Sequence, residues 1–332
     1  MKAVEATAPC RVDLAGGDLD VWPAYLFHPG AVALTVAIDR RAWCRVETGV
    51  EGIQIESKDA LSRAAAGTVS ELLDHPHLSP TARVLDALGA AEGLKVVTQS
   101  RVPVGSGLGG SSALAVATAA ATARALGRSV DPDVLWPLVR DSEARAIGGP
   151  TGIRDYHTAL RGGVVAVHLE PGQARVETLA VDPARVEECL LLVDSGANGP
   201  PGPSAWDVLK GQLDGDERVR RSLAAIAEAA RGVREALAEE RFEEVAPLLG
   251  AEWEARKQLA AGVTAPEIDR IVDVVREAGG AARACGAGGV VAVWAPPGSR
   301  GPGRREAVEA ALGKAGLRAF AARVDLRGLE VD

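Results

Sequence analysis

Residues 103–113 read Pro103-Val-Gly-Ser-Gly-Leu-Gly-Gly-Ser-Ser-Ala113, and most of what the sequence predicts starts from this stretch. Four glycines fall within residues 105–110, so the backbone can turn several N–H groups toward one point. The run 111–125 is so rich in Ala and Leu that it predicts a helix, whose N-terminus carries a partial positive charge. A glycine loop in front of a helix suits a polyphosphate.

The same loop also matches the pattern G-x-G-x-x-G over 105–110, after a predicted strand at 94–102, which raises dinucleotide binding as a competitor. A dinucleotide-binding βαβ unit has an acidic residue at the end of its second strand, whereas here Asp131 and Asp133 begin a second predicted helix. This order of elements disfavours dinucleotide binding. A Walker A loop requires Gly-Lys-Ser/Thr, and this loop contains no lysine. Ser111 and Ser112 can cap the helix or reach a phosphate-bound Mg²⁺, and the residues alone leave both roles open.

Two acidic residues flank a break in the chain downstream of this loop. Glu143 belongs to the predicted helix 131–146, the segment Gly148-Gly149-Pro150 ends that helix, and a short turn then presents Asp155. Such a pair suits a metal ligand and a general base. The alternative is a solvated Glu143 and an N-capping Asp155, and the upstream glycine loop is what favours the functional interpretation.

Near the N-terminus, Arg11 is followed by a Gly-Gly turn that exposes Asp18 and Asp20, with Trp22 close behind. Carboxylates beside aromatic faces are suited to polyols. The alternative is an Asx-type turn in which the Asp side chains bind the backbone. A further glycine loop, 286–289, precedes an apolar strand and by itself indicates only a tight turn.

The remaining pattern predicts an α+β protein of two lobes, which we divide into residues 1–180 and 181–332. The predicted strands are 31–38, 42–47, 53–57, 94–102, 164–169, 189–193, 290–295 and one around 318–324. The predicted helices are 111–125, 131–146, long amphipathic ones from 204 to about 261, 266–278 and 304–315.

Charge and composition exclude several classes of protein. The chain of 332 residues has 37 Lys and Arg against 45 Asp and Glu, a net charge of −8 with no basic block, so a nucleic-acid partner is not expected. The longest uncharged stretch, 102–123, begins with Pro, Gly and Ser and leaves too short an apolar run to cross a bilayer. The first residues have no basic and apolar leader pattern, so we expect a cytoplasmic protein.

Taken in order, the segments 8–20, 103–113 and 286–289 resemble the motifs of the GHMP kinase superfamily. The resemblance extends over nearly the whole chain. Within the superfamily, the sequence motifs are most similar to those of the heptose phosphate kinases and the galactokinase-like sugar kinases. The resemblance implies a ribosomal-protein-S5-domain-2-like N-terminal lobe and a ferredoxin-like C-terminal lobe. It also implies ATP- and Mg²⁺-dependent phosphorylation of a hydroxyl, the anomeric one in a sugar or sugar phosphate, by a monomer or homodimer.

The resemblance also assigns roles to individual residues. Asp155 would be the catalytic base, and Arg11 would keep it ionised and stabilise the developing alkoxide. Ser111, with Ser112 as the substitute, and Glu143 would bind Mg²⁺. The ATP-binding residues would be Pro103, Gly105, Ser106, Gly107, Leu108, Gly109, Gly110, Ser111 and Ser112. The substrate-binding residues would be Asp20, Gly17, Asp18, Trp22, Gly152, Gly286 and Gly288.

Some residues depart from the family pattern. Gly110 stands where many relatives have serine, and Val290 follows a glycine run that relatives often continue. Arg154 and Tyr156 flank Asp155 where some heptose-type relatives carry glutamine, and the loop 196–203 lacks an expected arginine. The acceptor can therefore differ from heptose 7-phosphate. The alternatives are a kinase for a non-sugar alcohol and a sensor that binds ATP and sugar without turnover.

Overall fold

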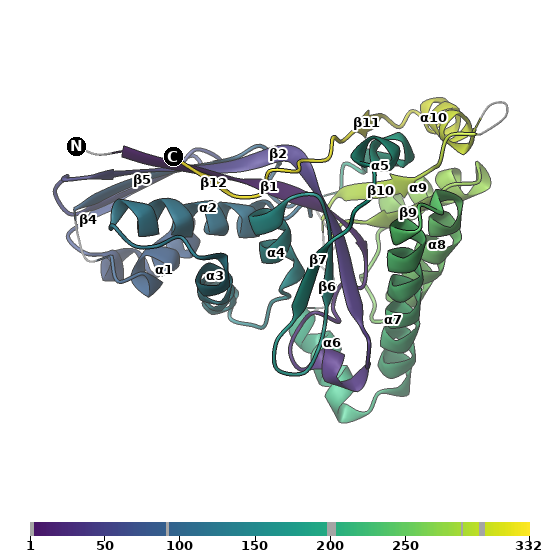
Figure 1. The fold of residues 1–332 in the computed structure, drawn as a ribbon, viewed down its shortest axis with the longest axis horizontal. Helices are drawn as coiled ribbons and strands as arrows, with labels where there is room; N and C mark the ends of the chain where they lie inside the picture. Colours follow the sequence, from purple (N-terminus) through teal and green to yellow (C-terminus); the bar gives the residue numbers. More distant parts are fainter. Residues whose placement is uncertain (1–2, 91–92, 198–203, 287, 299–302) are drawn as a thin grey trace.

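The protein is described by a computed structural model that covers residues 3–90, 93–197, 204–286, 288–298 and 303–332. Two β-sheets, each packed against helices, form two lobes that lie side by side (Figure 1). The expectation of a two-lobed α+β protein is confirmed. No helix in the described part of the chain is long and apolar enough to span a bilayer.

The first sheet is eight-stranded, with the order β12-β1-β2-β5-β3-β4 and with β6 and β7 attached beside β2. Most neighbours are antiparallel, and β3 runs parallel to β5. Its strands are β1 Ala3–Ala15, β2 Val32–Thr48, β3 Ile53–Ser57, β4 Ser62–Ala66, β5 Leu94–Ser100, β6 Val164–His168, β7 Arg175–Thr178 and β12 Glu330–Val331. The division near residue 180 stays a prediction, and the final strand crosses it to pair with β1.

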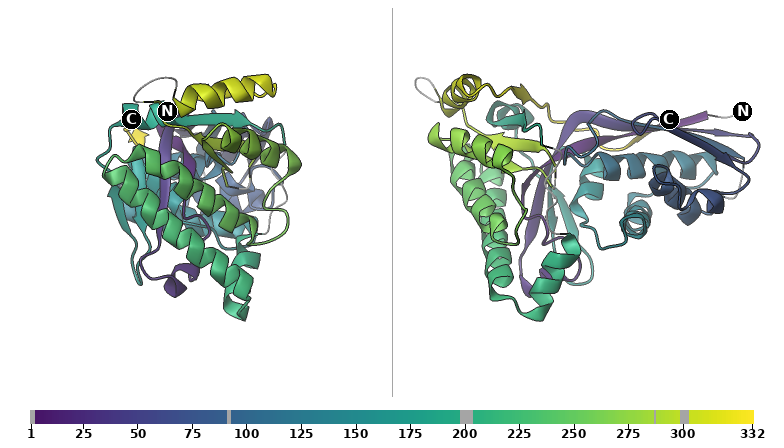
Figure 2. Two further views of the ribbon diagram at one scale, coloured as in Figure 1. Left: turned by 90° about the vertical axis from the view of Figure 1, so that its right-hand side faces the viewer. Right: turned by 180° about the vertical axis from the view of Figure 1, so that it is seen from behind.

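Helices cover one face of this sheet (Figures 1 and 2). They are α1 Ser79–Ala87, α2 Gly110–Ala125, α3 Pro132–Ile147 and α4 Arg154–Arg161, together with the short turn η2 Val69–Leu72. The other short turn, η1 Ala24–Phe27, lies elsewhere and packs its Ala24 against Leu209. The central helix α2 is mostly Ala, Thr and Val and is buried along nearly its whole length. Small side chains let α2 lie close to the strands, which fixes the glycine loop at its N-terminus against the sheet.

The second sheet has the order β11-β8-β10-β9 and is antiparallel throughout its described pairings. Its strands are β8 Leu190–Asp194, β9 Ala281–Ala284, β10 Val290–Trp294 and β11 Ala319–Ala321. The helices of this lobe are α5 Pro183–Cys189, α6 Ala205–Asp214, α7 Glu217–Ala238, α8 Phe242–Lys257, α9 Pro266–Glu277 and α10 Arg304–Lys314.

Several elements differ from those expected. The strands expected at 31–38 and 42–47 form one continuous strand, β2, whose register against β1 shifts at Pro9 and Cys10. Asp155 lies in the first turn of helix α4, not in a short turn, so that expectation was wrong. Residues 198–203 of the loop that lacks an arginine lie outside the described residues.

The two glycine loops meet where the lobes join. The N–H of Gly289 donates to the Gly105 carbonyl at 3.0 Å, and the N–H of Val290 donates to the Ser106 carbonyl at 3.1 Å. A Cβ on Gly107 would lie 1.8 Å from the carbonyl oxygen of Cys285, at a φ of +77°. Only glycine fits at this position, because both its backbone conformation and the space exclude a side chain.

Candidate active site

The glycine loop lies beside the candidate active site, where Arg11 binds it. Gly105, Gly107 and Gly109 all have positive φ, and Gly109 is the N-cap of α2. A Cβ added to Gly105 would meet nothing within 4 Å, so the loop has open space beside it. A cradle of glycine amides at a helix N-terminus is suited to phosphate oxygens.

Gly110, the departure from the family pattern, begins α2 and is packed closely. An added Cβ there would lie 2.7 Å from Cγ2 of Val102 and 3.0 Å from Oγ of Ser100. A serine at this position would therefore have to displace a buried neighbour. Val102 and Ser100 thus explain why glycine occupies this position in this chain.

Glu143 accepts hydrogen bonds from three hydroxyl groups, two at the start of α2 and one on α4. Ser111 Oγ donates to Glu143 Oε1 at 2.9 Å, while Ser112 Oγ and Tyr156 Oη donate to Oε2 at 3.0 and 2.5 Å. Burial and the neighbouring Glu143 carboxylate raise the pKa of Tyr156 well above its usual value, so its hydroxyl stays a donor. Tyr156 was not predicted as a site residue.

These oxygen donors fit a magnesium ion beside a triphosphate. The described residues contain no cluster of three or more His, Cys, Asp or Glu side chains that could hold a metal alone. Mg²⁺ in phosphoryl-transfer sites takes one or two protein oxygens and completes its shell with phosphate and water. Glu143 and the exposed Ser111 hydroxyl match that donor set, whereas Ser112 is buried.

Arg11 and Asp155 form a bidentate ion pair near the loop. Nε of Arg11 donates to Oδ1 of Asp155 at 2.8 Å, and Nη2 donates to Oδ2 at 2.7 Å. The Arg11 side chain is 6% exposed and that of Asp155 is 18% exposed, so the carboxylate retains access to the cleft. Burial alone would lower the pKa of Arg11. The neighbouring carboxylates of Asp13 and Asp155 outweigh that effect, so the pKa lies above its usual value.

Arg11 also binds the glycine loop itself. Its backbone N–H donates to the Leu108 carbonyl at 2.9 Å, and Nη1 donates to the Gly107 carbonyl. A Cβ on Gly109 would come within 3.0 Å of the Arg11 side chain. One arginine therefore joins the candidate base to the candidate phosphate cradle.

Arg154 links two buried carboxylates on the other side of Asp155. Its Nε donates to Oδ1 of Asp13 at 2.8 Å, and its Nη1 donates to Oδ1 of Asp20 at 2.6 Å. Burial alone would raise the pKa of Asp13, but Arg11 and Arg154 hold it far below its usual range. Neither Asp13 nor Arg154 was predicted as a site residue.

Asp20 is fully buried, and both of its oxygens are occupied. Oδ2 accepts the N–H groups of Ile153 and Arg154 at 2.7 and 3.0 Å, and Oδ1 accepts from the Arg154 side chain. Asp20 therefore holds the start of α4, and its expected role in binding substrate stays a prediction. Gly152 lies against it, because an added Cβ there would be 2.3 Å from Oδ2.

A cavity of about 820 Å³ opens beside the Arg11–Asp155 pair. Of the residues expected to bind substrate, Asp18, Gly152 and Gly286 line it. Asp20 and Trp22 instead line an adjoining hollow of about 440 Å³, which shares Pro150 and Thr151 with the cleft.

The two other glycines expected to bind substrate, Gly17 and Gly288, contact other parts of the protein. Gly17 gives its carbonyl to Arg256 Nη2 at 3.0 Å. Gly288 packs on the glycine loop, and a Cβ there would be 2.0 Å from the nitrogen of Gly107.

Arg256 is a cleft residue that sequence reasoning missed. It lies on α8, lines the cavity, donates to Asp18 through Nη1, and pairs with the buried Glu252 at 2.8 Å. Arg283 pairs with the same Glu252 at 2.9 Å. A Glu and an Arg four residues apart on the otherwise apolar buried face of α8 were the available signal.

Comparison with known proteins identifies the family to which the chain belongs. Residues 77–163 match the model of the GHMP kinases N terminal domain, and residues 233–317 match that of the GHMP kinases C terminal domain. Together the two matches make up more than half of the chain.

Among curated relatives, a mevalonate kinase of Thermococcus sibiricus is 26% identical, with 99% of this chain and 98% of the relative covered. A D-glycero-alpha-D-manno-heptose 7-phosphate kinase of Campylobacter jejuni is also 26% identical, over 90% of this chain and 91% of the relative.

Solved structures with similar folds include two sugar kinases. A D-glycero-D-manno-heptose 1-phosphate kinase from Bacteroides thetaiotaomicron superposes with a TM-score of 0.77 at 23% identity, over 99% of this chain and 98% of the other. The galactokinase of Lactococcus lactis in complex with galactose gives a TM-score of 0.78 at 14% identity, over 99% and 95%. These two likenesses concern the fold.

Proposed function

Because the chain belongs to the GHMP kinase family of phosphotransferases, we propose that it transfers the terminal phosphoryl group of ATP to a hydroxyl of a sugar or sugar phosphate. The observation that carries this proposal is the bidentate Arg11–Asp155 pair, bound to the glycine loop and facing the cavity. The proposal retains the expectation of a cytoplasmic enzyme.

In this proposal Asp155 accepts the proton of the acceptor hydroxyl. Its carboxylate is partly exposed to the cleft and held in one orientation by two charge-assisted hydrogen bonds. A positioned base of this kind contributes about 10²- to 10⁴-fold to the rate. Arg11 stabilises the negative charge that develops on the acceptor oxygen and on the transferred group.

The phosphates of ATP would lie along the amides of residues 105–110 and at the N-terminus of α2. Glu143 and Ser111 would hold Mg²⁺, which neutralises phosphate charge when it is bound. Ser112 and Tyr156 would keep the Glu143 carboxylate oriented toward the loop through their hydroxyl donors.

The acceptor would occupy the cavity of about 820 Å³ on the other side of Asp155. Asp18 and Arg256 offer a carboxylate and a guanidinium there, and the backbone of Gly152 and Gly286 lines the same cavity. The charged side chains within this mixed polar and apolar lining favour a polyol or its phosphate over an apolar alcohol. A non-sugar alcohol is the alternative, because mevalonate kinases are among the relatives.

The proposal is tested by measuring ADP release from ATP and Mg²⁺ over a panel of hexoses, heptoses, their phosphates and mevalonate, with the product located by ³¹P NMR. Acceptor-dependent ADP release and a new sugar phosphate ester are expected. If mevalonate is the only compound phosphorylated, the acceptor is a non-sugar alcohol and the sugar part of the proposal is wrong. ATP binding without turnover of any acceptor would support a sensor.

A further inference from the structure

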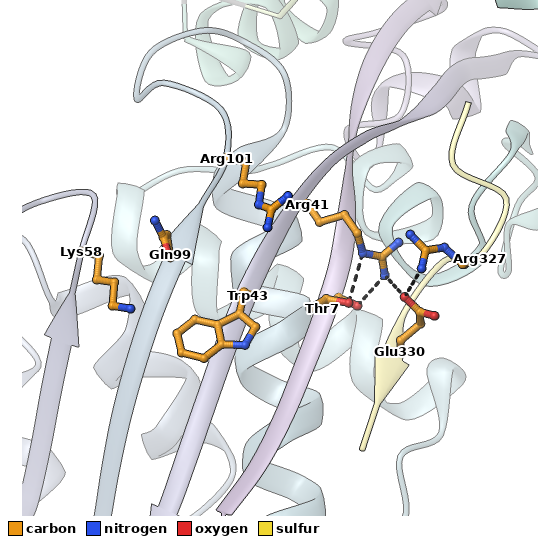
Figure 3. Close-up of a pocket in the computed structure, with 8 residues that line it drawn as sticks. All are labelled: Thr7, Arg41, Trp43, Lys58, Gln99, Arg101, Arg327 and Glu330. Carbon is orange, nitrogen blue, oxygen red and sulfur yellow. Dashed lines mark hydrogen bonds and ion pairs between the residues drawn. The ribbon is translucent and has the colours of Figure 1, made fainter. Parts of the chain in front are cut away.

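A second cavity, of about 480 Å³, lies on the outer face of the first sheet (Figure 3). Helices α1 to α4 pack on the opposite face, and the two cavities share none of their described lining residues. The lining residues are Thr7, Arg41, Trp43, Lys58, Gln99, Arg101, Arg327 and Glu330.

The strand register brings the centre of this cavity together. Thr7 of β1 pairs with Trp43 of β2, and Trp43 pairs with Gln99 of β5, so the three side chains form a cross-strand row on one face. Lys58 follows β3 at the end of this row, and its Nζ lies 5.0 Å from the centre of the Trp43 ring. The row and the cavity are therefore fixed by the sheet.

Half of the positive charge around the cavity is neutralised within it. Arg41 binds Asp325 at 2.6 Å and Glu330 at 3.1 Å. Arg327 binds the same two carboxylates, both at 3.3 Å. Two arginines and two acids form a balanced group at one end of the cavity.

The other two cations, Arg101 and Lys58, have no carboxylate partner in the described part of the chain. Two nearby acids make hydrogen bonds to other groups. Asp59 accepts the N–H of Ser100 at 2.8 Å, and Glu5 accepts the indole N–H of Trp43 at 2.9 Å. Two unpaired positive charges in one cavity stand out in a chain whose net charge is −8.

We infer that this cavity binds a small phosphate monoester. Such a group carries nearly two negative charges at neutral pH, which matches the two unpaired cations. Arg101 supplies a planar fork of donors, Lys58 an ammonium, and Gln99 an amide N–H₂. The cavity is larger than a phosphate group, so the organic part of the ester would lie beside the Trp43 ring.

The position of the cavity connects it to the glycine loop. Arg101 is separated from Pro103 only by Val102, and its N–H donates to the Arg41 carbonyl at 3.1 Å. A ligand on Arg101 would therefore sit at the point where β5 leads into the loop. The binding inference itself does not rest on the proposed kinase activity.

Fluorine NMR of protein labelled with 5-fluorotryptophan tests this inference. Trp43 lines the outer cavity and Trp206 lines the active-site cleft, so the two sites have separate reporters. Each resonance is assigned with a Trp→Phe variant. Ribose 5-phosphate is titrated at constant ionic strength, with ribose and sulfate as comparison ligands. We expect a saturable shift of the Trp43 resonance with ribose 5-phosphate, a weaker shift with sulfate and none with ribose.

Matched variants identify the phosphate contacts. Arg101→Gln and Lys58→Gln should each raise the Kd reported by Trp43 at least about tenfold, because each removes a charged hydrogen bond. Arg45→Gln is the control, since Arg45 lies on the same face of β2 but pairs with Glu5 and Glu47 outside the cavity. No saturable Trp43 shift, an equal shift with ribose or sulfate, or an unchanged Kd in Arg101→Gln would each overturn the inference.

Discussion

Arg11 and Asp155, 144 positions apart in the sequence, bind each other through two parallel hydrogen bonds of 2.8 and 2.7 Å. Arg11 belongs to β1 and Asp155 to the first turn of α4, so the pair fixes a helix end against a strand. Arg11 also donates to the Gly107 carbonyl, which makes the position of the candidate base depend on the glycine loop.

Replacement of Asp155 by Asn should remove turnover and preserve nucleotide binding. The amide keeps the shape of the side chain but cannot accept the hydroxyl proton, so kcat should fall by about 10²-fold or more. Steady-state ADP release and calorimetric titration with a non-hydrolysable ATP analogue measure the two quantities. Asp141→Asn, on the exposed side of α3, is the control and should leave both unchanged. Normal turnover by Asp155→Asn would remove Asp155 from the role of base.

The Mg²⁺ dependence of activity distinguishes metal binding by Glu143 and Ser111 from a role of Ser111 in capping the helix. Ser111→Ala should raise the Mg²⁺ concentration needed for half-maximal activity, and Glu143→Gln should raise it further, because each removes an oxygen donor. Activity measured over a series of Mg²⁺ concentrations gives this value. Ser142→Ala is the control, because its hydroxyl bonds to the Leu138 carbonyl within α3. If Ser111→Ala needs no more Mg²⁺ than the unmodified protein, Ser111 is not a metal ligand and Ser112 becomes the candidate.

Gly107→Ala should destabilise the protein far more than Gly127→Ala. Both glycines have φ in the left-handed region, which costs a side chain about 1 kcal/mol. Only at Gly107 would the new Cβ also meet a backbone atom, the Cys285 oxygen at 1.8 Å, whereas Gly127 has nothing within 4 Å. Urea unfolding measures the two losses. Equal losses would show that the two glycine loops are not in close contact.

The buried His157 should make stability depend on pH. Burial and the nearby Arg161 lower the pKa of His157 from 6.5 to about 4, and the ring lies 4.9 Å from that of Trp136. The unfolded chain then binds a proton that the folded chain does not, so the free energy of unfolding should fall as the pH drops from about 6.5 to about 4. The total loss from this group is about 3 kcal/mol.

Urea unfolding at several pH values tests the His157 prediction, with His157→Gln as the comparison. Between pH 6.5 and 4, the free energy of unfolding of the variant should depend less steeply on pH, by an amount that corresponds to the uptake of about one proton. His28, whose pKa burial also lowers, contributes to the slope in both proteins. An identical slope in the two proteins would contradict the assignment to His157.

The glycine loop and the helix behind it could be predicted from the sequence because their signals are local. Closely spaced glycines and an Ala-rich run act through neighbouring residues, and α2 begins at Gly110, one residue before the predicted start at Ser111. The pairing of Arg11 with Asp155 was expected from the resemblance to GHMP kinases, since no local rule connects positions so far apart.

Other features could not be predicted, for physical reasons. Strand β1 was missed because residues 8–15 are buried on both faces, which removes the alternation that marks a half-exposed strand. The engagement of Asp20 by Arg154 depends on tertiary contact across more than a hundred residues. The register that brings Lys58, Gln99 and Trp43 into one cavity likewise exists only in the assembled sheet.

The most direct measurement is a crystal structure of the protein with Mg²⁺ and a non-hydrolysable ATP analogue. We predict that the triphosphate lies along residues 105–110, with its terminal phosphate facing Asp155 and Arg11 and with Glu143 beside the metal. A triphosphate bound away from this loop, or with its terminal phosphate pointing away from the Arg11–Asp155 pair, would contradict it.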